Sequence, residues 1–348
     1  MERFRRRRPR FADDVITLAH GAGGKASAAL IDAVFLEAFA NAGNRGPQTD
    51  AARLHPSPGH HLAFTTDAFV VKPARFPGGS IGHLAVHGTV NDLAVIGAIP
   101  RWLSVSFVLE EGLDVEVLRE IVADMAEAAS EAGVEIVTGD TKVVDRGAAD
   151  GLFITTAGVG EVPEGRSLDA RAVEPGDAVL VSGSIADHGM AVMLARGDLA
   201  LRAEIVSDTA SVAGLVADVL RDAPGTRWMR DPTRGGVATV CNELVGDCGL
   251  GLVLDETSLP VKPAVEGACD LLGIDPLYVA NEGKVIAVVP ADQAEAALAA
   301  MRARPEGVDA TRIGEIVSDP AGVVVLRTAF GSTRIVDMLV GDPLPRIC

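Results

Sequence analysis

Aromatic side chains, cysteine and basic residues are all scarce in this sequence of 348 residues. Aromatics make up 4% of the chain, so Ala, Val, Leu and Gly must fill its cores. The four cysteines are widely spread and form no CxxC pair, which excludes a disulfide framework and a CxxC zinc site. Acidic residues outnumber basic ones by 48 to 31, and a net charge of −17 argues against a nucleic-acid partner. No hydrophobic run approaches a membrane-spanning length, so we expect a soluble, cytoplasmic enzyme with no membrane partner.

The length predicts more than one hydrophobic core, and turn residues suggest where the division lies. Pro and Gly cluster between residues 161 and 176, so we expect an N-terminal domain over 15–162 and a C-terminal domain over 163–338. The mixture of predicted helices and strands, without long regular alternation, indicates an α+β fold. Residues 1–14 carry six arginines and are expected to form a disordered basic extension, or else an arm for an acidic partner.

The chain ends in a cysteine, Cys348, at the end of a proline-containing segment. Pro343 and Pro345 favour an extended approach to the thiol, and Arg346 places a positive charge beside it. We expect residues 339–348 to form a mobile tail that carries this thiol. The alternative is a frayed chain end that happens to finish in cysteine.

Glycine-rich and acidic segments in the first half suggest a nucleotide site. The segment His20–Lys25 precedes an amphipathic helix, and its free amides could cradle an anion, although a lid or a plain turn fits equally well. Asp67 lies in an apolar strand, Asp92 follows Asn91 in a helix predicted over 81–96, and Asp140 is expected at the end of a strand. Three carboxylates at such positions suit Mg²⁺ carried by a nucleotide.

The second half adds a positive group and a further carboxylate. Asp231–Gly236, with the sequence DPTRGG, precedes a predicted helix, so Arg234 and the helix N-terminus could contact phosphate. Glu282 lies in the segment NEGK, immediately before a predicted strand. The remaining cysteines are expected to be small core residues: Cys241, Cys248 and Cys269.

Taken together, these motifs resemble the HypE family of hydrogenase maturation factors, within the superfamily of aminoimidazole ribonucleotide synthetase. The resemblance runs from about His20 to Cys348. It is carried by HGAGGK (20–25), TTD (65–67), GTVNDLAVIGA (88–98), TGDTKVV (138–144), DPTRGG (231–236), NEGK (281–284) and the terminal PRIC (345–348).

This resemblance implies a two-domain fold and an activity. The N-terminal domain would contribute strands to a β-barrel shared by a homodimer, and the C-terminal domain would be an α/β sandwich. The activity would be ATP-dependent dehydration of a carbamoyl group on Cys348 to a thiocyanate, which donates the cyanide ligand of [NiFe] hydrogenase. The implied partners are the carbamoyltransferase HypF and the HypC–HypD iron scaffold complex.

The resemblance also implies roles for individual residues. Glu282 would be the base and Lys142 would orient the carbamoyl group on Cys348. Asp67, Asp92 and Asp140 would hold the Mg²⁺ that is bound with ATP. The full set of residues implied to bind ATP is Gly23, Gly24, Lys25, Asp67, Asn91, Asp92, Asp140, Thr141, Asp231 and Arg234.

Two other classes of function remain open at this point. One is a different ATP-dependent enzyme of the superfamily that acts on a free small molecule and does not need Cys348. A selenophosphate synthetase is disfavoured, because no cysteine precedes Cys241. The other is a non-catalytic scaffold for maturation partners, which would tolerate Asp92→Asn.

Overall fold

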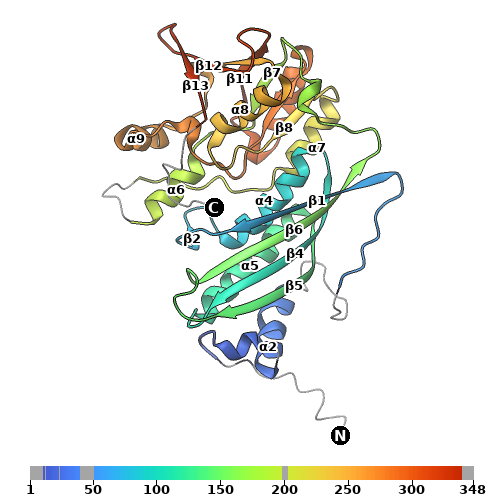
Figure 1. Ribbon diagram of the computed structural model, residues 1–348, viewed down its shortest axis with the longest axis vertical. Helices are drawn as coiled ribbons and strands as arrows, with labels where there is room; N and C mark the ends of the chain where they lie inside the picture. Colours follow the sequence, from blue (N-terminus) through green and yellow to red (C-terminus); the bar gives the residue numbers. More distant parts are fainter. Residues whose placement is uncertain (1–10, 12, 23, 40–50, 198–202, 339–348) are drawn as a thin grey trace.

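The computed structural model describes residues 11, 13–22, 24–39, 51–197 and 203–338. Gly23, the basic extension up to residue 10 and the tail 339–348 with Cys348 therefore lie outside the described residues. Two large sheets, a two-stranded sheet of β2 and β3, and the covering helices build the described part of the chain, and the fold is the predicted two-domain synthetase-like α+β fold (Figure 1).

The first half contains a four-stranded sheet in the order β1-β6-β4-β5, in which only β4 and β5 run parallel. Helices α4 and α5 cover one face of this sheet (Figure 1). The elements up to the end of the sheet are η1 (Leu18–Gly21), α2 (Lys25–Leu30), the π-helix η2 (Ile31–Leu36), α3 (Glu37–Phe39), β1 (His60–Phe69), β2 (Arg75–Phe76), β3 (Gly79–Ser80), α4 (Ile81–Val95), β4 (Ile99–Glu110), α5 (Val115–Ala132), β5 (Glu135–Val144) and β6 (Leu152–Pro163).

The second half is built on a seven-stranded sheet in the order β13-β12-β9-β11-β7-β10-β8, in which β12 and β9 are the one parallel pair. Its elements are η3 (Ala170–Ala172), β7 (Ala178–Val181), α6 (Asp187–Ala195), α7 (Ala213–Asp222), β8 (Trp228–Arg230), α8 (Gly236–Cys248), β9 (Gly251–Asp255), η4 (Glu256–Ser258), α9 (Pro263–Leu272), η5 (Pro276–Tyr278), β10 (Ile286–Val289), η6 (Ala291–Gln293), α10 (Ala294–Arg302), η7 (Pro305–Gly307), β11 (Thr311–Val317), β12 (Val324–Arg327) and β13 (Thr333–Val336).

Side-chain alternation on the central strand β7 divides this second sheet between two helical layers. Val179 and Val181 point to the cluster that contains α8, whereas Ala178 and Leu180 point to the cluster that contains α7 and α10. All four side chains are fully buried, so β7 is apolar throughout. The result is a helix–sheet–helix sandwich, as predicted for this half.

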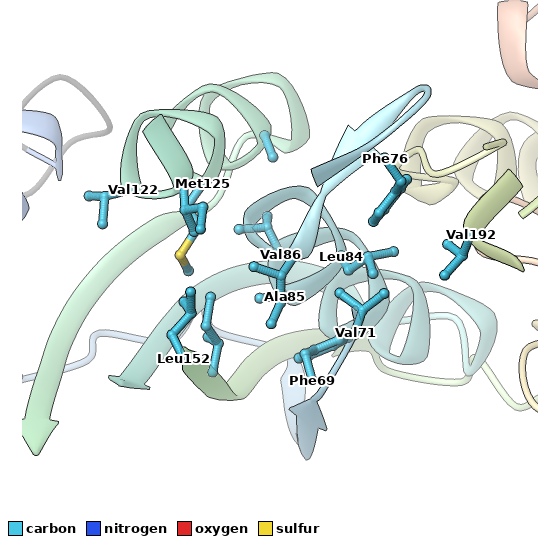
Figure 2. Close-up of a cluster of buried hydrophobic side chains, with 14 of the residues drawn as sticks. Phe69, Val71, Phe76, Leu84, Ala85, Val86, Val122, Met125, Leu152 and Val192 are labelled. Atoms are coloured by element: carbon cyan, nitrogen blue, oxygen red, sulfur yellow. The ribbon is translucent and has the colours of Figure 1, made fainter. Parts of the chain in front are cut away.

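Helix α4 joins the two halves. It packs on the first sheet and on α5, and its other side contacts α7. Its side chains are therefore buried nearly all round, unlike those of α5, whose apolar stripe faces only the core. Figure 2 shows the same core continuing from Leu84 and Val86 of α4 to Val192 of α6. Asn91 and Asp92, near the end of α4, thus lie at the junction between the two halves.

Two local predictions need correction. Asp140 does not end a strand, because β5 continues to Val144 and hydrogen-bonds to β4 over this length. Cys248 is half-buried at the end of α8, whereas Cys241 and Cys269 are core residues as expected. Burial raises the pKa of the Cys241 thiol to about 12, so this thiol is an inert packing group.

Candidate functional site

A cavity of about 320 Å³ lies where the first sheet, α4 and α8 meet. Strand β1, helix α4, the loop before α8 and the segment before β10 each contribute to its wall. Its lining residues are Thr66, Asp67, Ala68, Phe69, Gly88, Asp92, Arg230, Asp231, Thr233, Arg234, Thr239, Val240, Glu243 and Glu282.

Asp67 and Asp92 enter this cavity from the first half. Asp67 pairs in register with Thr156, whose hydroxyl donates to Ala85 of α4, so Asp67 lies on the helix-covered face of the sheet. Asp92 accepts a hydrogen bond of 2.9 Å from the Thr65 hydroxyl. Burial raises the pKa of both carboxyls, and the charge of Asp67 raises that of Asp92 further.

The loop before α8 adds the third carboxylate. Asp231 is almost inaccessible, and burial, together with the charges of Asp92 and Asp67, raises its pKa to about 7. Arg234 lies three residues further on, is exposed, and lowers the pKa of both Asp67 and Asp92 by its charge. Three acids of one charge, faced by an exposed guanidinium, create a site that favours a cation together with an anion.

The sequence DPTRGG folds as it does because of two glycines with positive φ. Gly235 has φ +72° and caps α8, and Gly236 has φ +61° in its first turn. A Cβ on Gly236 would lie 2.5 Å from the carbonyl oxygen of Leu277 and 2.6 Å from that of Val279. Gly236 therefore permits close packing of α8 on the chain that leads to Glu282.

Asn281 fastens this chain to the same loop. Its side-chain amide donates to the Pro232 carbonyl at 2.8 Å, and its side-chain oxygen accepts from the Ala186 backbone N–H at 2.7 Å. The neighbouring residue Glu282 is buried, and its Oε2 atom has no hydrogen-bond partner among the described residues. Burial and the surrounding carboxylates, Asp208 first among them, raise the pKa of Glu282 well above its usual value.

Models of two protein families match the chain: the N-terminal domain of AIR synthase related protein over residues 48–162, and its C-terminal domain over residues 174–327. The carbamoyl dehydratase HypE of Rhodobacter capsulatus is 56% identical over 97% of this chain and 99% of its own length. The chain belongs to the HypE family of carbamoyl dehydratases.

Solved structures of HypE proteins agree with this membership. A HypE in complex with ATP superposes with a TM-score of 0.89 at 47% identity, over 95% of this chain and 99% of that one. A HypE–HypF complex contains a chain that superposes with a TM-score of 0.78 at 47% identity, over 89% of this chain and 99% of that one.

The cavity brings together five of the residues predicted for the HypE site. They come from both halves of the chain and from segments more than 200 residues apart in sequence: Asp67, Asp92, Asp231, Arg234 and Glu282. Asn91 lies behind the cavity rather than in its wall. Its amide donates to the carbonyls of Ala210 and Glu282 at 3.0 Å each, and its oxygen accepts from the Val212 N–H at 2.8 Å.

A second group of predicted site residues lies on strand β5, away from this cavity. Asp140 pairs with Ser106, which pairs with Thr155, so these side chains share the face of the sheet opposite to Asp67. Lys142 points to that same face and forms an exposed ion pair of 2.9 Å with Asp140. The hydrogen bond from Lys142 lowers the pKa of Asp140.

The glycine-rich loop adjoins this second group. A Cβ on Gly21 would lie 2.9 Å from Cβ of Val143 in β5, and both Gly24 and Lys25 are exposed. Figure 1 shows α2, which this loop precedes, beyond β5 and at the opposite end of the long axis from α8. Within one chain, therefore, neither Lys25 nor Lys142 lines the acidic cavity; nor does Thr141, between Asp140 and Lys142.

Sequence reasoning missed Asp208, which the structure places against the backbone of Glu282. Asp208 lies in the segment Ser207–Ser211, which has no glycine, no predicted element and no recognisable motif. The contact of Asp208 with Glu282 is visible only in the folded chain, because there this segment lies beside residues 282–284.

Proposed function

We propose that this chain uses ATP to dehydrate a carbamoyl group carried on Cys348, forming the thiocyanate from which the cyanide ligand of [NiFe] hydrogenase is made. The observation that carries the proposal is the buried Glu282 facing three carboxylates and Arg234 in one cavity, in a chain of the carbamoyl dehydratase family. The net reaction converts a thiocarbamate and ATP into a thiocyanate, ADP and phosphate. The oxygen atom of the carbamoyl group leaves in the phosphate.

The donor set fits a nucleotide with Mg²⁺. Asp67, Asp92 and Asp231 supply hard oxygen ligands, and their mutual repulsion is relieved when a divalent cation binds. We assign Asp67 and Asp92 to Mg²⁺, and Arg234 to a phosphate of ATP. When bound, Mg·ATP supplies the phosphoryl group that makes the carbamoyl oxygen a leaving group. A HypE relative has been solved with ATP, which supports ATP as the nucleotide of this site.

Glu282 is suited to act as the base. Its carboxyl is buried and one oxygen is unpaired within the described chain, so it can accept a proton from a ligand in the cavity. The proton that must leave is the one remaining on the carbamoyl nitrogen. A base with a raised pKa has a stronger driving force for taking this proton than an exposed carboxylate.

The two separate groups of predicted residues point to a homodimer. We propose that the open face of the first sheet pairs with the same face of a second chain, as the predicted shared barrel requires. Because β1, with Asp67, is an edge strand of this sheet, the pairing would bring Asp140 and Lys142 of one chain to the edge of the cavity of the other, together with the backbone at Thr141 and the glycine-rich loop beside β5. Phe64 of β1 supports this, because its side chain is 72% exposed on the uncovered face of the sheet.

The proposed partners follow from the reaction. HypF would load the carbamoyl group on Cys348, in keeping with the solved HypE–HypF complex, and a HypC–HypD complex would receive the cyanide. No helix in the described part of the chain is long and apolar enough to cross a membrane. A cytoplasmic location stays a prediction.

Two variants test the proposed chemistry. We expect wild type, incubated with HypF, carbamoyl phosphate and Mg·ATP, to gain a carbamoyl group and then lose one water, as measured by intact mass. In Glu282→Gln, which lacks the base, and in Asp92→Asn, which lacks a nucleotide-site carboxylate, the carbamoyl adduct should form but not lose water. A scaffold would convert no adduct in wild type. Full conversion by both variants would contradict the proposal.

A further inference from the structure

Residues 205–212, here called the strap, precede α7 and contact both α4, through Asn91, and the segment 282–284. The Ser207 N–H also donates to the Pro77 carbonyl, in the turn between β2 and β3, at 2.8 Å. A Cβ on Gly283 would lie 2.0 Å from the carbonyl oxygen of Asp208. The strap and the Glu282 segment are therefore in direct backbone contact.

Side chains from two different elements hold the peptide groups of Glu282. Its N–H donates to Oδ1 of Asp208 at 3.3 Å, and its carbonyl accepts from Nδ2 of Asn91 at 3.0 Å. Asp208 comes from the strap and Asn91 from α4. Both side chains are buried, with 3% of Asp208 and none of Asn91 exposed.

Lys284 completes this arrangement from the far side of Gly283. Its ammonium lies 3.5 Å from Oδ2 of Asp208 and donates to the Gly283 carbonyl at 3.2 Å. Asp208 thus contacts the chain on both sides of Gly283, through a backbone N–H and through a lysine side chain. A buried carboxylate needs such partners to remain in place.

The strap lines a second cavity rather than the first. Glu282 lines the cavity of about 320 Å³ that holds the three carboxylates, whereas Asp208 and Lys284 line a second cavity of about 240 Å³. Asp208 does not line the first cavity, so it contacts no ligand bound there. Its direct contact with the wall of the first cavity is the hydrogen bond from the Glu282 N–H.

We propose that Asp208 is a positioning residue, which with Asn91 fixes the backbone of Glu282 and so aims its carboxyl group at the bound carbamoyl group. The proposal rests on the proposed role of Glu282 as the base. Proton transfer requires the base within hydrogen-bond reach of the proton, so a small displacement of the peptide lowers the rate without changing nucleotide binding.

The test compares three substitutions by the rate of carbamoyl-to-cyano conversion, with HypF in excess and saturating ATP, and by the Kd of the isolated protein for Mg·ATP. We expect Asp208→Ala to lower the conversion rate at least tenfold, with Kd changed less than about twofold. Asp208→Asn should restore the rate to within about threefold of wild type, because its amide oxygen accepts the same hydrogen bond. Asp309→Ala, which removes an exposed acid from the second cavity, should match wild type.

Further variants separate loss of structure from failure of the proposed base. If Asp208→Ala does not fold, Asp208→Leu, which fills the space without an acceptor, takes its place. A wild-type rate in the folded variant, or a loss explained by a weaker Kd, overturns the proposal. So does an Asp208→Asn rate as low as that of Asp208→Ala. If Glu282→Gln itself keeps the wild-type rate, the proposed base is wrong instead.

Discussion

In the free enzyme, ionisation of Asp231 is unfavourable because other carboxylates surround it. Its carboxyl is buried beside Asp92 and Asp67, and its pKa is raised to about 7. In the unfolded chain the same carboxyl ionises near its ordinary value of 3.8. Between these two values the folded state holds a proton that the unfolded state has lost, so rising pH lowers the free energy of unfolding.

Asp231→Asn should remove this part of the pH dependence. Without nucleotide or Mg²⁺, we expect the stability that the variant gains over wild type to be about 4 kcal/mol larger at pH 8 than at pH 4. Denaturant unfolding at both pH values measures it, and Asp309→Asn, an exposed acid, is the control. Parallel pH dependence of wild type and Asp231→Asn would show that Asp231 does not titrate as described.

Individual site residues were predictable only where a motif contains them. Asp67, Asp92, Asp231, Arg234 and Glu282 lie in recognisable motifs, and the structure brings them to one cavity. Asp67 and Asp140 were both predicted to hold Mg²⁺, Asp67 from within an apolar strand and Asp140 from the end of one. Their opposite orientations depend on the register of four paired strands, which one strand's sequence does not contain.

At the scale of elements, the first residues of α8 determine how closely this helix packs on the neighbouring chain. Gly236 has a positive φ and lies so close to the carbonyls of Leu277 and Val279 that no Cβ fits. The sequence suggested that these glycines let a phosphate approach. The structure adds that Gly236 lets the Glu282 segment approach.

Gly236→Ala should separate α8 from this segment. We expect a loss of about 2 kcal/mol or more in the free energy of unfolding, with weaker Mg·ATP binding, because both the backbone strain and the steric clash oppose the native position. Gly246→Ala, an exposed position of the same helix with no atom within 4 Å of the added Cβ, should instead gain up to about 1 kcal/mol. Equal effects of the two changes in denaturant unfolding would contradict this account.

Helix α4 was predicted with nearly correct ends, but its environment was not. A helix between two halves is buried on almost every side, so its sequence has no polar stripe from which its packing could be read. Asn91 was predicted as a nucleotide ligand from the family resemblance, and the structure places it behind the cavity. Its three hydrogen bonds to the strap and to Glu282 exist only because the second half folds against α4.

For the whole molecule, the central expectation is a site shared between two chains. Lys142→Ala and Glu282→Gln should each be inactive alone. Mixing them by unfolding and refolding should restore about a quarter of the wild-type conversion rate, because half of the dimers are mixed and each has one intact site. No activity in a mixture proven to contain mixed dimers would place both residues of a site in one chain.

The most direct test of the account is intact mass after incubation with HypF, carbamoyl phosphate and Mg·ATP, for wild type and Cys348→Ala. We predict that wild type acquires one carbamoyl group and converts it to a cyano group, and that Cys348→Ala acquires neither. Because Cys241 and Cys269 are buried, they should not substitute for Cys348. A cyano adduct on Cys348→Ala, or ATP hydrolysis by wild type without any adduct, would contradict the account and point to a free small-molecule substrate.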